Sequence, residues 1–312
     1  MKKENLIFRL SNELGNQLFM YAAGYSFAKK MNRNLYIDNE TAFKLKKNIS
    51  HYGLDEFYIN NTIAPDKFKF LNFHGYIKRK FFLKLDKIKK KKSFYIEHKN
   101  KEKISFFNEK FLKCEYGKNL YIEGHFESEK YFTDFKKEIV DQYEFRLKEI
   151  YSKNNYYNEI MNSNSVSICI RQNRFSEKLR KIDSTDINKS KNYSLEQIRY
   201  VKKAIKLISS KISDPKFFIW SNNLNGLDEF FPKKNFIHVK NDQLQEIGRK
   251  PLLDLFLMTQ AKHFIVIPSS FNWWGAYLSK NKNKIIIRPD DKNFKDFKIN
   301  NLDFWPTNWI KI

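Results

Sequence analysis

The first forty residues alternate between short apolar runs and a helical pattern. Residues 6–10 form an apolar run long enough for a buried strand, and residues 34–38 form another. Between them lies a polar turn over residues 11–15, and the apolar side chains that follow it recur at helical spacing: Phe19, Ala22, Ala23 and Phe27. This pattern predicts a strand, a helix and a second strand, with Gly15 where the helix begins.

The second half of the chain repeats this alternation more clearly. Strands are predicted at residues 166–171, 217–220, 236–239, 263–267 and 284–288, and helices at 252–261 and from Asn272. Ser194 and Gln197 have the spacing of a capping box, so we expect a polar loop over residues 172–192 and a helix start at Ser194. Alternating strands and helices predict an α/β fold built on parallel sheets.

The length of the chain predicts two domains. At about 150 residues per domain, 312 residues correspond to two units. Residues 40–150 show weak periodicity, whereas the later part is regular, so we place the boundary near residue 150, with domains 1–150 and 151–312. Hydrophobic residues make up 41% of the chain, which is enough for packed cores in both.

Several features indicate a soluble protein of the cytoplasm. No apolar run reaches the ~18 residues that a membrane-spanning helix needs. The N-terminal sequence also lacks the apolar core of a signal peptide. The two cysteines, Cys114 and Cys169, cannot form a disulfide framework, which fits a reducing compartment.

The chain is strongly basic, with 59 Lys and Arg against 35 Asp and Glu and a net charge of +24. Such an excess attracts nucleic acid, anionic lipid or a phosphorylated substrate. A composition rich in Lys, Asn, Ile and Phe throughout explains it equally well, and both interpretations stay open. No recognition motif for RNA or DNA is present, so we expect no nucleic-acid partner.

One stretch is more basic than the rest. Residues 78–92, from Lys78 to Lys92, combine many lysines with Phe81, Phe82 and Leu83. This mixture predicts a basic amphipathic surface helix, for which a peripheral contact with the anionic face of the inner membrane is the expected use.

Motifs for metal-dependent and nucleophilic chemistry are absent. The sequence contains no H-E-x-x-H, C-x-x-C, G-x-x-x-x-G-K-[ST], G-x-G-x-x-G or D-x-D motif, so we expect neither a metal nor a cofactor. Three candidates for anion binding remain: residues 15–17 and 269–271 at strand-to-helix turns, and Arg171 at the end of a predicted strand. Each has an ordinary alternative: a turn glycine, a helix cap and a surface salt bridge. Trp273 and Trp274 are interpreted as core residues.

Taken in order, several segments resemble the α-1,2-fucosyltransferases of glycosyltransferase family 11. They are LGNQLFMYA at residues 14–22, GHFESEKYF at 124–132, FFIWSNN at 217–223, and DLFLM at 254–258 with SSFNWWGA at 269–276. The resemblance covers most of the chain. It implies a GT-B fold of two Rossmann-like domains facing a central cleft, with the acceptor on the N-terminal side and GDP-L-fucose held mainly by the C-terminal domain.

The resemblance also implies roles for individual residues. Asp254 would accept hydrogen bonds from the guanine, and Arg171 would neutralise the charge on the departing β-phosphate. Ser269, Ser270 and the backbone at Phe271 would hold the pyrophosphate. A metal-free enzyme needs such donors, because they alone stabilise the leaving group. The other implied donor contacts are Gly15, Asn16 and Gln17 from the first domain and Asn222 from the second.

The chain departs from the family at one motif. Where the family usually shows H-x-R-R-x-D, residues 169–174 read C-I-R-Q-N-R. Arg171 keeps the first arginine, but Arg174 replaces the aspartate that is the usual candidate for general base. Glu177, three residues further on, is the replacement we predict.

The resemblance therefore implies an inverting, metal-independent transfer of L-fucose from GDP-β-L-fucose to a hydroxyl. The expected acceptor is O-2 of a galactose in an oligosaccharide precursor of a bacterial surface glycan. A lipid-linked form of this oligosaccharide is one of the acceptors considered. Two alternatives stay open: a related inverting transferase with another nucleotide-sugar donor, and a non-catalytic basic binding protein.

Overall fold

The structure is a computed structural model that describes residues 3–44, 51–60, 62–177, 184–240, 250–294 and 299–312. The chain divides into two compact units: residues 1–146 with 300–306, and residues 147–299 with 307–312. The sequence placed one boundary near residue 150 and did not anticipate that residues 300–306 return to the first unit.

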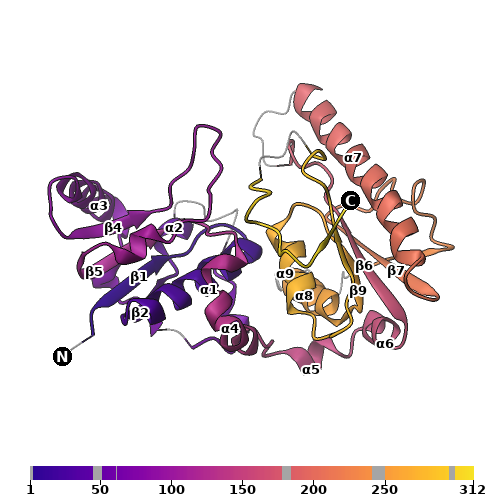
Figure 1. The fold of residues 1–312 in the computed structure, drawn as a ribbon, viewed down its shortest axis with the longest axis horizontal. Coiled ribbons are helices and arrows are strands. Elements are labelled where there is room, and N and C mark those ends of the chain that lie inside the picture. The colour runs from indigo at the N-terminus through magenta and orange to yellow at the C-terminus, as the bar shows by residue number, and fades with distance from the viewer. Residues whose placement is uncertain (1–2, 45–50, 61, 178–183, 241–249, 295–298) are drawn as a thin grey trace. The chain divides into compact units, whose positions relative to one another are not determined.

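The first unit contains a parallel sheet in the order β3-β2-β1-β5-β4. Figure 1 labels the strands β2, β1, β5 and β4 of this sheet. Its strands are β1 (Asn5–Arg9), β2 (Asn34–Asp38), β3 (Thr62–Ile63), β4 (Lys92–Ile96) and β5 (Tyr116–Glu123). Its α-helices are α1 (Leu14–Lys30), α2 (Thr41–Lys44), α3 (Asn72–Asp86) and α4 (Lys136–Gln142). Short 3₁₀ turns lie between them: η1 (Leu54–Glu56), η2 (Asp66–Phe68), η3 (Lys110–Lys113), η4 (Glu129–Tyr131) and η5 (Thr133–Phe135).

Aromatic residues fill the core of the first unit. Phe8 of the central strand β1 packs edge-on against Phe126, with ring centroids 5.6 Å apart, and Phe27 of α1 contacts the same ring at 5.1 Å. All three side chains are fully buried. Burial of such rings contributes about 1.5–3 kcal/mol each, so this cluster anchors α1 on the sheet.

The second unit contains a parallel sheet in the order β11-β10-β9-β6-β7-β8. Its strands are β6 (Asn164–Ile170), β7 (Pro215–Ser221), β8 (Phe236–His238), β9 (His263–Ile265), β10 (Ile286–Arg288) and β11 (Ile310–Lys311). Its helices are α5 (Lys148–Tyr151), α6 (Asn155–Met161), α7 (Ser184–Ser209), α8 (Lys250–Gln260) and α9 (Ser270–Leu278). The predicted α/β fold with parallel sheets is confirmed.

The predicted start of the long helix is wrong. α7 begins at Ser184, ten residues before the expected capping box, and Ser194 lies inside it with its hydroxyl donating to the Ser190 carbonyl at 3.0 Å. A serine can make this bond within a helix, so its presence does not require a helix start. The expected polar loop therefore ends before residue 184.

Two other expectations concern apolar segments. Trp273 and Trp274 of α9 are fully buried, which confirms their interpretation as core residues. Within the described residues, none of the helices combines the length and the apolar character needed to cross a bilayer.

Candidate functional site

The strand order of the second unit reverses at its first strand, β6. The chain proceeds from β6 to β7 and β8 on one side, and β9 and β10 then lie on the other side of β6. In open parallel sheets this reversal opens a crevice at the carboxyl ends of the two strands that flank it. Arg171 directly follows β6, and residues 269–271 follow β9, so these two sequence-predicted anion-binding segments follow the two strands that flank the reversal.

The backbone of Arg171 is held by a buried glutamine from α7. Gln197 accepts the Arg171 N–H at 2.7 Å and donates to the Arg171 carbonyl at 2.9 Å. Its side chain is fully buried, so both bonds are shielded from water. The sequence analysis missed this residue, because it assigned Gln197 to a capping box.

The guanidinium of Arg171 points to a carboxylate in the loop that follows β6. Its Nη2 lies 2.5 Å from Oε1 of Glu177, and its Nε is buried with no hydrogen-bond partner within the described residues. Glu177 thus contacts the arginine itself. It orients the guanidinium, and its predicted role as a base stays a prediction.

Asn222 connects the loops that follow β6 and β7. Its Oδ1 accepts the Gln172 N–H at 2.8 Å, its Nδ2 donates to the Gln172 carbonyl at 3.0 Å, and Nδ2 also lies 3.5 Å from Oε2 of Glu177. The side chain of Gln172 links the same two loops a second time, because it donates to the Asn223 carbonyl at 2.6 Å. The structure therefore brings Arg171, Glu177 and Asn222 together at one edge of the sheet.

On the other side of the strand reversal, two half-buried serines, Ser269 and Ser270, lie at the start of α9. Ser269 is the N-cap residue, but its side chain makes no capping hydrogen bond. Ser270 and Phe271 occupy the first turn, where the helix dipole and backbone N–H groups favour an anion. Asn272 fixes this turn, since its Oδ1 accepts the Ile267 N–H at 2.8 Å.

Asp254 of α8 and Cys169 of β6 lie close enough to interact electrostatically. Burial raises the pKa of the Cys169 thiol; the nearby charge of Asp254 raises it further, and Arg171 opposes this. The thiol that replaces the family's histidine is therefore a neutral, buried group. Asp254 is thus near the end of β6, and its contact with the guanine stays a prediction.

The predicted turn of the first unit, residues 15–17, makes several hydrogen bonds to the surrounding backbone. Gly15, Asn16 and Gln17 lie in the first turn of α1, and the N–H groups of Asn16 and Gln17 donate to the Glu13 carbonyl at 3.0 and 3.1 Å. The Gln17 side chain is fully buried and bonds to the Asn12 and His51 carbonyls and to the Gly53 N–H. The Gln17 amide therefore positions two loops, and contact of residues 15–17 with a donor stays a prediction.

Besides Asn16, which was predicted, polar residues that were not assigned from the sequence gather at the carboxyl-terminal edge of the first sheet. They follow β1 and β5, which flank the strand reversal of this unit. Asn12 pairs with His125 at 2.7 Å, and Asn16 donates to Glu127 at 2.6 Å. Burial raises the pKa of Glu97, although the His125 and Phe126 N–H groups donate to its carboxylate. Glu127 lies in the segment 124–132, whose resemblance to the family was noted without a role for this carboxylate.

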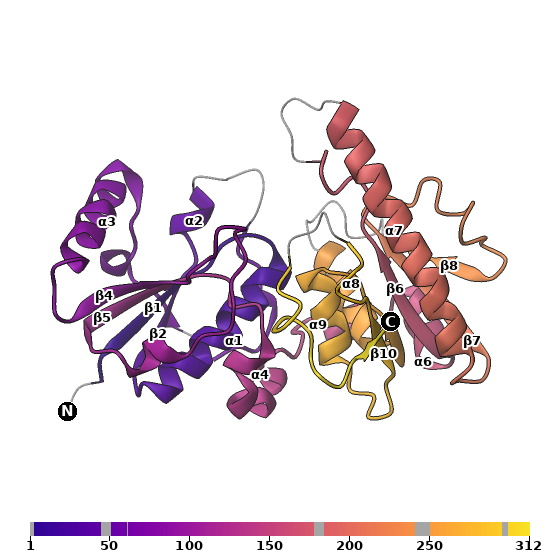
Figure 2. The ribbon, with the colours of Figure 1, turned by 45° about the horizontal axis from the view of Figure 1, so that its top comes forward.

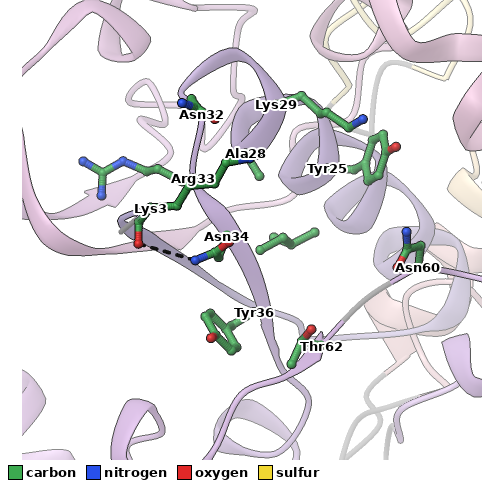
Figure 3. A pocket seen from close by; sticks show the side chains of 11 residues that line it. Lys3, Tyr25, Ala28, Lys29, Asn32, Arg33, Asn34, Tyr36, Asn60 and Thr62 are labelled. Atoms are coloured by element: carbon green, nitrogen blue, oxygen red, sulfur yellow. Dashed lines mark hydrogen bonds between the residues drawn. The ribbon is translucent and has the colours of Figure 1, made fainter. Parts of the chain in front are cut away.

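A separate pocket of about 440 Å³ lies at the amino-terminal edge of the first sheet (Figure 3). Two of its cationic groups already have partners: Arg33 pairs with Glu4 at 2.6 Å, and Lys29 lies 3.3 Å from Glu138. The pocket is also at the opposite edge from the strand reversal, so we do not assign it to the site. Within the described residues, no three His, Cys, Asp or Glu side chains are grouped as metal ligands, and metal independence stays a prediction.

Two Rossmann-like units with parallel sheets define the GT-B class of glycosyltransferases. The structure is similar to NodZ α-1,6-fucosyltransferase soaked with GDP-fucose, with a TM-score of 0.55 and 16% identity over 94% of this chain and 97% of that one. A mutant of Arabidopsis thaliana FUT1 in complex with GDP is also similar, with a TM-score of 0.52 and 14% identity over 95% of this chain and 72% of that one. At such identities the likeness concerns the fold.

The chain belongs to glycosyltransferase family 11, whose family model matches residues 5–312. An α-1,2-colitosyltransferase of Escherichia coli is 27% identical over 98% of both chains. The O-antigen biosynthesis glycosyltransferase WbnK of Escherichia coli is 25% identical over 90% of this chain and 92% of that one. The protein is therefore a glycosyltransferase, as predicted.

Proposed function

We propose that this protein transfers L-fucose from GDP-β-L-fucose to a hydroxyl of a bacterial surface-glycan precursor, with O-2 of a galactose as the acceptor atom. One observation carries the proposal: Arg171 is pinned at the strand reversal of the second unit, across from the N-terminus of α9. A guanidinium and a helix N-terminus with two serines match the charge of a diphosphate. The relatives named for O-antigen synthesis and colitosyl transfer support the glycan class.

The proposed reaction is a single displacement. The acceptor oxygen forms a bond to C1 of the sugar while the bond from C1 to the β-phosphate oxygen breaks, and the configuration inverts. The electron pair leaves with GDP, whose negative charge Arg171, Ser269 and Ser270 would stabilise. Preorganised donors of this kind are each worth about 3–4 kcal/mol in a transition state. The acceptor proton passes to a carboxylate, for which Glu177 is proposed.

In this proposal Asp254 binds the guanine, and Asn222 holds the loop that carries Glu177. The backbone at Phe271 adds an N–H group for the pyrophosphate. In the first unit, Gly15 and Asn16 remain proposed donor contacts, with Gln17 as a positioning residue. No metal takes part.

A second donor deserves equal testing, because the relative that is 27% identical is named a colitosyltransferase. Colitose is L-fucose without its 3-hydroxyl. A site that hydrogen-bonds this hydroxyl rejects the deoxy sugar by about 10⁴–10⁵-fold, whereas an apolar site accepts it. The kcat/KM for GDP-L-fucose divided by that for GDP-colitose therefore identifies the donor. A ratio far below unity would show that the donor is GDP-colitose and not GDP-L-fucose.

Thermal unfolding tests the donor site directly. We expect GDP and GDP-L-fucose, at about 100 times their dissociation constants, to stabilise the protein by ~2.7 kcal/mol, while UDP-galactose has no effect. Arg171→Ala should reduce this shift, and Arg199→Ala, which removes an exposed arginine of α7, should not. Absence of a shift with every guanine nucleotide would contradict the proposed site.

A further inference from the structure

α3 presents an apolar and basic face that no other described element covers. Phe73, Phe81 and Ile88, the last just beyond the helix, are 72%, 56% and 83% exposed, and Tyr76 and Ile77 are about half exposed. These side chains recur every three or four residues together with lysines, so they share one face. We call it the α3 face: Phe73, Tyr76, Ile77, Lys80, Phe81, Lys84, Lys87 and Ile88.

The opposite side of the helix fixes this orientation. Arg79 donates through Nε to Glu123 of β5 at 2.8 Å and contacts its other oxygen through Nη2. Asp86, at the end of α3, accepts the N–H groups of Ser93 and Phe94 at 2.7–2.8 Å. α3 packs beside the edge strand β4 in this way (Figure 2). Its apolar outer residues therefore face away from the sheet.

The charge of this region has one sign. Residues 72–92 contain nine Lys and Arg and one acidic residue, Asp86, which is buried. Arg79 is paired with Glu123, which leaves the lysines as the exposed charges. The exposed ones are Lys78, Lys80, Lys84, Lys87, Lys89, Lys90 and Lys91.

We propose that the α3 face binds the surface of an anionic lipid bilayer, with its rings and isoleucines in the headgroup boundary and its lysines against anionic headgroups. Apolar residues amid lysines on one helical face fit this partner. A second copy of the chain would bring like charges together. Single-stranded nucleic acid would use the lysines and rings but has no use for Ile77 and Ile88.

Flotation of the full chain with vesicles tests the proposal. We expect binding to vesicles of phosphatidylcholine with about one-third phosphatidylglycerol, and none to phosphatidylcholine alone. Replacing Lys80, Lys84 and Lys87 by Gln should weaken binding about 100-fold, since each lysine near an anionic surface contributes about fivefold. Phe73→Ser with Phe81→Ser should weaken it about tenfold or more, because less apolar surface is buried.

A matched control separates this face from the general charge. Lys203→Gln, Lys206→Gln and Lys211→Gln remove three exposed lysines of the second unit and should leave binding nearly unchanged. Equal loss in this control overturns the proposal in favour of non-specific attraction. Loss with the lysine variant but not with the phenylalanine variant, together with salt-dependent retention of single-stranded RNA, overturns it in favour of nucleic acid. Unchanged thermal unfolding and GDP response show that each variant is folded, independently of the outcome of the donor proposal.

Discussion

At the scale of single residues, the site depends on how Arg171 is held. The side-chain amide of Gln197 bonds to both the N–H and the carbonyl of Arg171, and it also donates to the Tyr193 carbonyl at 3.2 Å. We expect Gln197→Leu to lower kcat/KM for the donor at least tenfold, because the unpaired backbone of Arg171 would turn to new partners. Leaving a buried group unpaired costs about 1–3 kcal/mol, so thermal stability should fall as well.

A second glutamine distinguishes positioning from stability alone. Gln260 of α8 donates to the Phe256 carbonyl at 3.2 Å and to the Thr259 hydroxyl at 2.8 Å. Gln260→Leu should lower stability without changing the donor KM or the response to GDP. If both variants lose donor binding in proportion to their loss of stability, Gln197 has no specific role at Arg171.

The two residues also show what a sequence can predict about a site. Arg171 was predicted because it follows an apolar run, and parallel strands bind ligands at their carboxyl ends. The role of Gln197 could not be predicted, because its partner is the backbone of a residue 26 positions away, and a bond to backbone produces no recognisable pattern of side chains in the sequence. The positioning role of Gln17 was not predicted for the same reason: its motif is visible in the sequence, but the backbone carbonyls to which its amide donates are not.

At the scale of elements, the position of α3 depends on a glycine. A Cβ on Gly75 would lie 2.5 Å from the carbonyl carbon of Phe70 and 2.9 Å from its oxygen, and backbone cannot yield as a side chain does. We expect Gly75→Ala to cost about 1–3 kcal/mol and to speed amide exchange in α3. Gly117→Ala in β5 is the control, because its nearest neighbour would be 3.9 Å away. Equal exchange in the two variants would show that α3 is not packed as described.

The strands were predicted better than the helices, for a physical reason. β6 and β7 are buried along most of their length, and each contains an apolar run, at residues 168–170 and 217–220, that marks it as a strand. Before Tyr193, the first turns of α7 contain Ile187 as their one apolar residue, and it is exposed, so no apolar stripe marks them. Strand β3 spans only Thr62–Ile63, which is too short for any periodicity. Such elements are stabilised by contacts with residues distant in the sequence, and these contacts exist only in the folded chain.

At the scale of the whole molecule, the two units repeat one topological device. In each sheet the first strand of the unit lies at the reversal, between β2 and β5 in one and between β7 and β9 in the other. Polar residues collect at the carboxyl ends in both: Asn16 with Glu127, and Arg171 with Glu177. The chain also returns to its first unit through residues 300–306, which the alternating pattern did not reveal.

This return is held by Asp303. Its carboxylate accepts hydrogen bonds from Lys130 at 2.6 Å and from the Phe107 N–H at 2.9 Å, and its own carbonyl accepts the Ser128 hydroxyl at 2.6 Å. Burial alone would raise the pKa of Asp303, but the bonds from Lys130, Phe107 and Asn300 lower it below the ordinary 3.8. The ionised form therefore stabilises the fold above pH 3.8, and this contribution is lost as the pH falls through the lower, folded value.

We expect Asp303→Asn to weaken the attachment of residues 300–306 by about 1–3 kcal/mol at pH 7, because a charge-assisted bond is lost and a partly buried lysine remains. Amide exchange of this segment should accelerate at pH 7, and the difference from the wild type should narrow below the pKa of Asp303. Asp134→Asn is the control: it removes an exposed partner of Lys30, 2.9 Å away, and such exposed pairs contribute little. A difference that persisted unchanged at low pH would mean that the size of the side chain, and not its charge, holds the segment in place.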